Sequence, residues 1–294
     1  MSGDDYTFTQ EALVADLRAL GLETGDTVMM HSNASSIGPA KQMVKAPDTG
    51  MRWILDAILA AIGPKGTLAV PTFTKCFKDV KDGPTGEVWH PEKTPSRVGS
   101  LTNYVLRQPG RARSDHPTHP VAALGGRAAE FCKGHSWREG ASTFDRNGPW
   151  GKLVDWDGKI LWLGTDMRTQ TAVHVVEDWM KLPYMATCVA LVEDGGRTRE
   201  VQVTMSPAGP RDFYKQDSKA AKAWAAAGLC RQGRICKADS QLMSARTFID
   251  WLWKKHIEDP AIILNDNPEQ EWSVKAIRMN RDYLAKFKGE WKRW

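Results

Sequence analysis

The spacing of apolar residues divides the first part of the chain into alternating helices and strands. Leu13, Leu17 and Leu20 recur at helical intervals, which predicts an amphipathic helix that ends at Gly21. Short apolar runs predict buried strands, and a longer amphipathic stretch before a Gly-Pro pair predicts a second helix. The expected strands span residues 27–30 and 67–70, and the expected helices span residues 10–20 and 51–62.

The same alternation continues through the rest of the chain. Two β-rich runs flank Asp194-Gly195-Gly196, a combination typical of a β-hairpin, and the polar, Gly- and Pro-rich stretch 76–94 predicts a long loop. The other expected elements are helices over 95–107 (beginning near Ser96), 125–131 and 244–255, a strand over 160–163, and hairpin strands over 187–192 and 200–204. This order indicates an α/β fold, with a mixed central sheet flanked by helices and an added antiparallel hairpin.

The C-terminal residues differ in composition from the rest of the chain. They are basic, and their aromatic residues are Trp272, Tyr283, Phe287, Trp291 and Trp294. We therefore expect a main domain over 1–264 and a basic, aromatic helical extension over 265–294. This extension is suited to fold back over a pocket or to mediate a homodimer, and binding to a membrane surface is a weaker alternative.

Composition is typical of a cytoplasmic enzyme. The hydrophobic fraction of 41% supplies a sizeable core, and no apolar run approaches the ~20 residues that span a bilayer. Residues 1–5 are acidic, unlike a secretory signal. The five cysteines show no paired pattern, and the spacing of Cys230 and Cys236 fits no common zinc site. We interpret all five as reduced thiols and expect neither a metal nor a membrane partner.

Charge restricts the choice of partner only weakly. A net charge of +5 and a pI near 8.9 suit an anionic partner such as a nucleotide cofactor, but an ordinary surface with a basic tail explains them as well. No helix-turn-helix, aromatic RNP-like strand or zinc-finger spacing is present, so we expect no nucleic-acid partner. The glycine-rich patterns that bind nucleoside triphosphates or NAD are also missing.

Candidate acid–base chemistry follows the strand at 160–163. That strand ends at Gly164, and a short polar loop leads into a helix that opens at Thr171 and carries His174 and Glu177. Residues three apart on a helix share a face, and a carboxylate beside an imidazole fixes its tautomer and stabilises its protonated form. A general base requires both effects. For this motif alone, a structural histidine is the simpler alternative.

Three further segments extend this motif into an ordered set. They are His-Ser-x-x-Ser-Ser-Ile-Gly over 31–38, Gly-Thr-Leu-x-x-Pro-Thr-Phe over 66–73 and Arg-Ser-x-His-Pro over 113–117, followed by Thr-x-x-His-x-x-Glu over 171–177. Four ordered motifs are far more specific than any single one. Over roughly residues 10–255 the chain resembles the aminoglycoside 3-N-acetyltransferase family, also called antibiotic N-acetyltransferases.

The resemblance implies an acetyl-CoA-dependent enzyme. Its expected reaction acetylates the 3-amino group of a 2-deoxystreptamine aminoglycoside, which gives antibiotic resistance. His174 would be the general base for direct attack of the amine on the thioester, and Glu177 would orient it. Thr171, one turn earlier, is a candidate donor to the oxyanion that develops.

The remaining site assignments concern the two substrates. By resemblance, the residues expected to contact acetyl-CoA are Ser32, Ser35, Ser36, Gly38 and Ser114. Without that resemblance, the serine-rich loop is most simply a turn. The residues expected to contact the acceptor are Thr72, Phe73, Asp145 and Asp178, the last two because a polycation needs carboxylates. His119 departs from the small polar residue usual in the family and is expected to reshape the pocket.

Other readings stay open at this point. The same chemistry could act on another small amine, such as a biosynthetic amino sugar or an aminophosphonate. A noncatalytic CoA-binding scaffold would not require Thr171, His174 and Glu177 to be intact. A hydrolase would need Ser32 or Cys76 as nucleophile, and neither lies in a nucleophile-elbow pattern.

Overall fold

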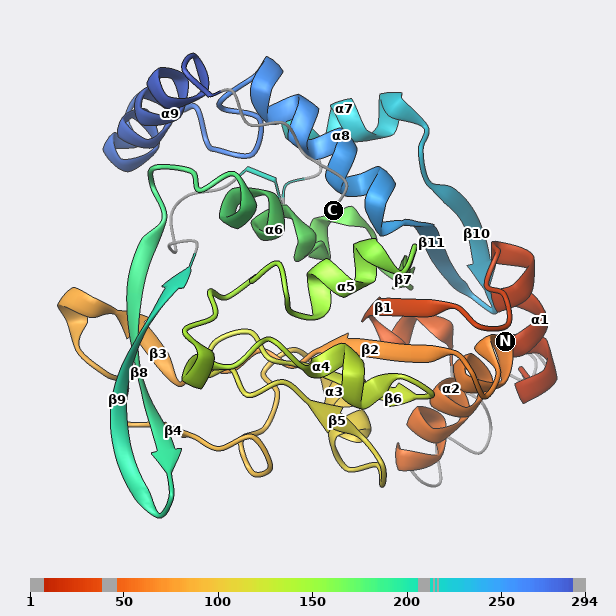
Figure 1. The fold of residues 1–294 in the computed structure, drawn as a ribbon. Coiled ribbons are helices and arrows are strands. Elements are labelled where there is room, and N and C mark those ends of the chain that lie inside the picture. The colour runs from red at the N-terminus through yellow and green to blue at the C-terminus, as the bar shows by residue number, and fades with distance from the viewer. Residues whose placement is uncertain (1–7, 39–46, 206–211, 214, 216, 288–294) are drawn as a thin grey trace.

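The computed structural model describes residues 8–38, 47–205, 212, 213, 215 and 217–287. Within these residues the centre of the molecule is a seven-stranded sheet (Figure 1). Its strands, in spatial order, are β10 (Arg231–Ile235), β11 (Ala238–Ser244), β7 (Lys159–Leu163), β1 (Thr27–Ser32), β2 (Thr67–Pro71), β6 (Val121–Gly125) and β5 (Ala112–Arg113). Strand β1 runs parallel to both β7 and β2, and the outer pairs are antiparallel. The predicted mixed sheet is therefore confirmed.

Alternate residues of the central strands enter two separate hydrophobic clusters, as the two-residue period of a strand requires. Met29 and Ile160 face the cluster built with α4 (Ala128–Cys132), α5 (Pro149–Asp155), α6 (Ala172–Trp179), α7 (Lys219–Ala227) and α8 (Ala245–Glu258). Val28 and Leu161 face the cluster built with α1 (Gln10–Leu20), α2 (Pro47–Ile62) and α3 (Ser100–Leu106). Helices thus cover both faces, and the central strands are buried on each side (Figure 1).

A second, smaller sheet contains the predicted hairpin. Strands β8 (Ala186–Asp194) and β9 (Arg197–Met205) pair along their whole length, and the turn between them has positive φ at Gly195 and Gly196. The expected loop over 76–94 is more ordered than predicted, because β3 (Phe77–Asp79) and β4 (Val88–Trp89) pair with β8 around a short 3₁₀ turn, η2 (Val80–Asp82). These short strands depend on β8, which is distant in sequence, so local polarity did not predict them.

Two predicted helices begin later than expected. Helix α3 starts at Ser100 because Ser96 lies in a turn, where its backbone N–H donates to Asn103 Oδ1 and its hydroxyl accepts from the N–H of Val98. Helix α4 starts at Ala128 because Gly125 still belongs to β6, with a φ of 113°. Helices α1 and α8 lie where the apolar spacing predicts them.

The predicted C-terminal helix is present as α9 (Glu271–Leu284), next to α8 in Figure 1. Ala276 and Leu284 join the same hydrophobic cluster as α6 and α8, and Tyr283 donates to the carbonyl of Met180 at 2.9 Å. The helix therefore packs against the C-terminal end of α6, while Trp291 and Trp294 lie outside the described residues. Its part in a homodimer stays a prediction. No helix in the described part of the chain is long and apolar enough to cross a membrane.

Candidate active site

Two loops meet at the edge of the sheet where β1 and β7 end, because parallel neighbours end on the same side. Strand β1 continues into a 3₁₀ turn, η1 (Ala34–Ile37), and β7 continues through η4 (Met167–Thr169) into α6. The backbone N–H of Asn33 donates to the carbonyl of Leu163 at 2.9 Å, and the Ser36 hydroxyl is 3.2 Å from the carbonyl of Gly164. The serine-rich loop and the segment that leads into the candidate catalytic motif are therefore joined directly.

The predicted histidine–carboxylate pair is formed on α6. His174 Nδ1 lies 2.5 Å from Oε2 of Glu177, whose side chain is 0% exposed, while the His174 side chain is 17% exposed. An ionised carboxylate only accepts hydrogen bonds, so Nδ1 is the protonated nitrogen. Nε2 on the opposite edge of the ring is then the atom with the lone pair that a general base needs.

A third member of this chain is Tyr184, whose hydroxyl donates to Glu177 Oε1 at 2.6 Å. Sequence reasoning missed it because the helix ends between the two residues. The N–H groups of Lys181 and Leu182 bond the carbonyls of Asp178 and Glu177, and Lys181 has a φ of 53°. This is a Schellman ending, which reverses the chain and returns Tyr184 to the helix. The one available signal was Pro183 just after the helix, which places the ending but not the contact.

Thr171 lies immediately before α6 and is buried. Its carbonyl accepts the backbone N–H of His174 at 3.0 Å, and the side chain of the preceding Gln170 accepts the N–H of Ala172. The threonine is therefore held one turn from the imidazole, as its spacing predicts. Its role as an oxyanion donor stays a prediction.

A series of rings connects Phe73 to His174. Phe73 lies 4.2 Å from His119, His119 lies 5.3 Å from Phe144, and Phe144 lies 5.8 Å from His174, measured between ring centroids. Burial, with the nearby His174 and His135, lowers the pKa of His119 to about 3, so this imidazole is neutral near pH 7. Phe73 is thus brought to the same side as the His174–Glu177 pair, with His119 between them.

Two predicted contact residues serve the scaffold instead. The fully buried Thr72 hydroxyl donates to the carbonyl of Pro120 at 3.0 Å and accepts from Arg113 Nε at 3.1 Å. Ser114 is 1% exposed, and its hydroxyl accepts from the N–H of Val121 and pairs with His135 Nδ1. Neither side chain has surface left for a ligand. The sequence did not predict that these two hydroxyls are buried and hydrogen-bonded, because their hydrogen-bond partners come from other segments of the chain.

The two predicted acceptor carboxylates differ in their surroundings. Asp178 Oδ2 accepts from the Ser142 hydroxyl at 2.7 Å and from the N–H of Phe144 at 2.9 Å. Burial raises the pKa of Asp178, although these two hydrogen bonds act in the opposite direction. Asp145 is partly exposed, and its Oδ1 accepts from the N–H of Asn147. Of the two, Asp145 is the carboxylate with the simpler path to a ligand.

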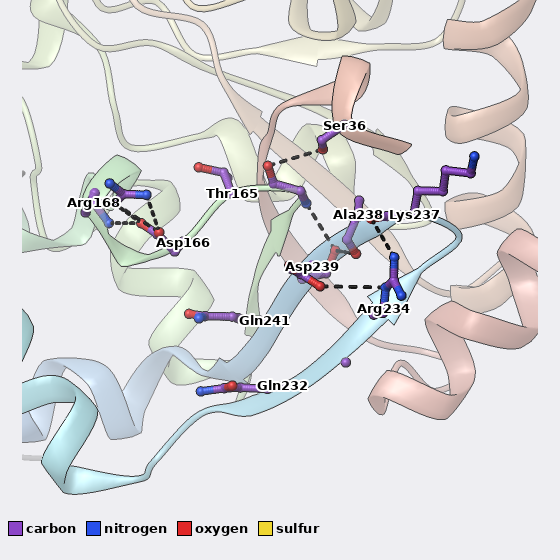
Figure 2. Close-up of a pocket in the computed structure, with 13 residues that line it drawn as sticks. Ser36, Thr165, Asp166, Arg168, Gln232, Arg234, Lys237, Ala238, Asp239 and Gln241 are labelled. Atoms are coloured by element: carbon purple, nitrogen blue, oxygen red, sulfur yellow. Dashed lines mark hydrogen bonds and ion pairs between the residues drawn. The ribbon is translucent and has the colours of Figure 1, made fainter. Parts of the chain in front are cut away.

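A cavity of about 620 Å³ opens beside the serine-rich loop (Figure 2). Its walls are the loop after β7 and the β10–β11 hairpin. It is lined by Ser36, Gly164, Thr165, Asp166, Arg168, Gln232, Gly233, Arg234, Lys237, Ala238, Asp239, Ser240 and Gln241. Arg168 pairs with Asp166 at 2.7 Å, and Arg234 lies 3.7 Å from Asp239. With Lys237, three cationic side chains oppose two carboxylates, so the walls carry a small positive excess.

The other predicted loop residues lie in the same segment as Ser36. Ser32 ends β1, and the exposed Ser35 donates to Asn33 Oδ1 at 2.7 Å. Gly38 has a φ of 95°, and its α-carbon faces the side chain of Lys237. Of the serines in this loop, Ser36 is the one that lines the cavity.

Metal and cysteine chemistry find little support among the described residues. No cluster of His, Cys, Asp and Glu suited to hold a metal ion occurs in them. His116 stacks on His135, with ring centroids 4.4 Å apart, while His119 turns toward Phe73, so the two histidines do not converge. Burial raises the pKa of the Cys76 thiol, which opposes the thiolate that a cysteine hydrolase requires.

Comparisons with known proteins identify the family. The family model for aminoglycoside 3-N-acetyltransferase matches residues 29–255. Aminoglycoside N(3)-acetyltransferase VII of Streptomyces paromomycinus is 29% identical over 84% of this chain and 91% of its own. Aminoglycoside N(3)-acetyltransferase IX of Micromonospora chalcea is 30% identical over 81% of this chain and 89% of its own.

Solved structures share the fold. Aminoglycoside acetyltransferase AAC(3)-Xa superposes with a TM-score of 0.73 at 25% identity, over 88% of this chain and 95% of its own. AAC-IIIb, solved as a binary complex with CoASH, has a TM-score of 0.73 at 24% identity, over 89% and 99%. The chain therefore belongs to the aminoglycoside 3-N-acetyltransferase family: it is an acyltransferase, and acetyl-CoA is the co-substrate of these enzymes.

Proposed function

We propose that this chain transfers the acetyl group of acetyl-CoA to the 3-amino group of a 2-deoxystreptamine aminoglycoside, with His174 as the general base. The observation that carries the proposal is the hydrogen-bonded chain from Tyr184 through Glu177 to His174 at the start of α6. It supports a base in a defined tautomer, as acyl transfer to an amine requires. The relatives named above support the substrate class.

His174 acts on the proton of the amine. An aliphatic amine is largely protonated near pH 7, so it first releases one proton to solvent, because an ammonium has no lone pair with which to attack. Nε2 then accepts a second proton from the nitrogen as the neutral amine attacks the thioester carbonyl. A C–N bond forms and the C–S bond then breaks, so the imidazolium can return its proton to the departing thiolate. Glu177 stabilises the imidazolium in between. A donor to the oxyanion, which we assign to Thr171, is typically worth ~10²–10³ in rate.

We assign acetyl-CoA to the serine-rich loop and the cavity beside it. Ser32, Ser35, Ser36 and Gly38 are small residues, which would let a pantetheine chain approach the backbone of this loop closely. The positive excess from Arg168, Arg234 and Lys237 suits the phosphates of the cofactor. The acceptor then reaches His174 from the side of Phe73 and His119, with Asp145 as a candidate carboxylate for one of its amines.

The deciding experiment measures thiol release from acetyl-CoA with a panel of amines. The panel contains gentamicin- and kanamycin-like antibiotics, a monoamino sugar and an aminophosphonate, with a control without amine that reports hydrolysis. We expect turnover of the antibiotics, with NMR placing the new acetyl group on the 3-amino nitrogen. No antibiotic turnover beside rapid turnover of the anionic amine would favour the aminophosphonate reading. Thiol release without any amine would favour a hydrolase, and no release at all a CoA-binding scaffold.

The role of His174 is tested separately. His174→Ala should lower kcat/KM by ~10²–10⁴ while CoA affinity stays near the wild-type value, as expected when a proton acceptor is lost. His90→Ala is the matched control, because His90 lies in the loop before α3 and bonds the backbone of Glu92. Equal rates for the two variants would remove His174 from the mechanism.

Ionic strength reports the charge of the acceptor. A polycation held by carboxylates binds less well as salt rises, because exposed charge pairs are screened. The KM for the antibiotic should therefore increase with salt while kcat changes little, and Asp145→Asn should weaken that dependence. An acceptor with a phosphonate would depend instead on cations, with Arg168 and Lys181 as candidates.

A further inference from the structure

Phe144 is attached to α6 by the two residues that directly follow Glu177. Its N–H donates to Asp178 Oδ2 at 2.9 Å, and its carbonyl accepts from Trp179 Nε1 at 2.8 Å. Its ring is 1% exposed and lies 5.8 Å from the ring of His174, with 33° between the planes. Helix α6 carries His174, and its residues Asp178 and Trp179 also fix the backbone of Phe144. The ring of Phe144 in turn packs against the ring of His174.

The two residues before Phe144 are held as firmly. The Ser142 hydroxyl donates to Asp178 Oδ2 at 2.7 Å, so one carboxylate oxygen accepts two hydrogen bonds from this segment. Thr143 donates both its N–H and its hydroxyl to the carbonyl of Thr204 on β9, and its own carbonyl pairs with His135 Nε2 at 2.9 Å. We call Ser142–Thr143–Phe144 the clamp segment.

We propose that Asp178 is a positioning residue that seats the clamp segment on α6, so that Phe144 restricts the orientation of His174. This inference rests on the proposed function and replaces the expectation that Asp178 binds the acceptor. Glu177 holds one edge of the imidazole, and a ring beside the imidazole limits its rotation about that contact. Both bonds end on Oδ2, the oxygen that faces the clamp segment, so this carboxylate has a structural use that requires no bound amine.

Loss of the clamp segment should affect kcat and KM differently. Misplacement of a catalytic group by about 1 Å can cost ~10²-fold in rate. Loss of the clamp should therefore lower kcat, because the amine and His174 Nε2 are then aligned less often. The KM values should change little, because a positioning residue does not itself bind either substrate.

Two variants of Asp178 distinguish positioning from substrate binding. The two hydrogen bonds end on the same oxygen, Oδ2. Asp178→Asn therefore keeps an acceptor oxygen there and removes the negative charge, whereas Asp178→Ala removes the acceptor oxygen as well as the charge. We expect Asp178→Ala to lower kcat by ~10–10²-fold with nearly unchanged KM values, and Asp178→Asn to retain most of the activity. A several-fold rise in the antibiotic KM for Asp178→Asn would place a substrate amine on this carboxylate and overturn the inference. Wild-type kcat for Asp178→Ala would overturn it as well.

A measurement on the imidazole tests the clamp without turnover. NMR signals of the His174 ring protons, assigned with His174→Ala, should shift in Phe144→Leu because the ring current of Phe144 is lost. Asp178→Ala should move the same signals, and Asp178→Asn should leave them close to wild type. Unmoved signals in Asp178→Ala would contradict the inference even if no amine substrate were found, so its failure is distinct from failure of the proposed function.

Ser218→Ala is the matched control for a general loss of stability. Ser218 accepts the N–H of Ala221 at the start of α7, so this change also removes a side-chain acceptor from a backbone donor, but outside the site. We expect it to lower the melting temperature without changing kcat or the His174 signals. If it lowered kcat as much as Asp178→Ala does, the effect at Asp178 would be one of stability alone.

Discussion

The hydroxyl of Tyr184 lies 2.6 Å from Oε1 of Glu177, so both oxygens of this buried carboxylate are engaged, since Oε2 contacts His174 at 2.5 Å. A carboxylate without exposed surface would be costly if either oxygen lacked a partner. The tyrosine thus lets Glu177 stay in place while it supports the imidazole. It adds a member to the acid–base chain that the motif alone does not contain.

Tyr184→Phe should lower kcat/KM by roughly tenfold. The change keeps the buried ring beside Trp272 and removes a hydrogen bond to a charged group, which is commonly worth about 1.5–3 kcal/mol. Steady-state kinetics at saturating acetyl-CoA measure the effect. Tyr104→Phe on α3 is the matched control and should leave the rate unchanged. A full rate for Tyr184→Phe would mean that the hydroxyl does not contribute to catalysis.

Glu177→Gln should lower the rate and move the acidic limb of the pH–rate profile toward lower pH. The negative charge that favours the imidazolium is removed, so a lower pH is needed to protonate the base. The measurement is kcat/KM for the amine across pH 5–9 at fixed ionic strength. A profile with unchanged shape and position would show that the carboxylate and the imidazole are not coupled.

Gly164→Ala should raise the KM for acetyl-CoA more than the KM for the amine. Gly164 has a φ of 65°, and a β-carbon there would overlap the Ser36 hydroxyl and lie 2.9 Å from the carbonyl of Asn33. The serine-rich loop would have to move. Gly195→Ala is a close control, since its φ is 59° but no atom lies within 4 Å of the added carbon. A larger rise in the amine KM would place this loop on the acceptor side, and Ser36→Val should give the same ranking.

Stability should fall as the solution is acidified below pH 6.5. Burial lowers the pKa of His31 and His135 to about 4 and that of His119 to about 3. Below pH 6.5 these histidines therefore take up protons in the unfolded chain, whereas in the folded chain His31 and His135 stay neutral until about pH 4 and His119 until about pH 3. The contribution of these histidines to the free energy of unfolding is therefore fully present above pH 6.5. It declines as the pH falls from 6.5 toward the pKa of each histidine in the folded chain, by about 1.4 kcal/mol per pH unit for each histidine. Urea unfolding at pH 7.5, 6 and 5 measures this, and a flat dependence would contradict the buried, neutral state.

The sequence by itself determined the elements whose signals are local. Leu13, Leu17 and Leu20 predict α1 because a helical period places them on one buried face. The spacing of His174 and Glu177 predicts their contact for the same reason, since residues three apart on a helix are neighbours. The glycines after Asp194 predict the β8–β9 turn because its residues need positive φ.

Only the tertiary structure decided which distant residues share the site. The hydroxyls of Thr72 and Ser114 are used within the fold, and the cavity joins Ser36 to a hairpin about two hundred residues later in the chain. Phe144 reaches His174 because Asp178 and Trp179 bond its backbone. Spacing along the chain determines contacts only within a helix, strand or turn. Contacts between separate elements depend on how the helices pack on the sheet, and this packing follows from the whole buried surface.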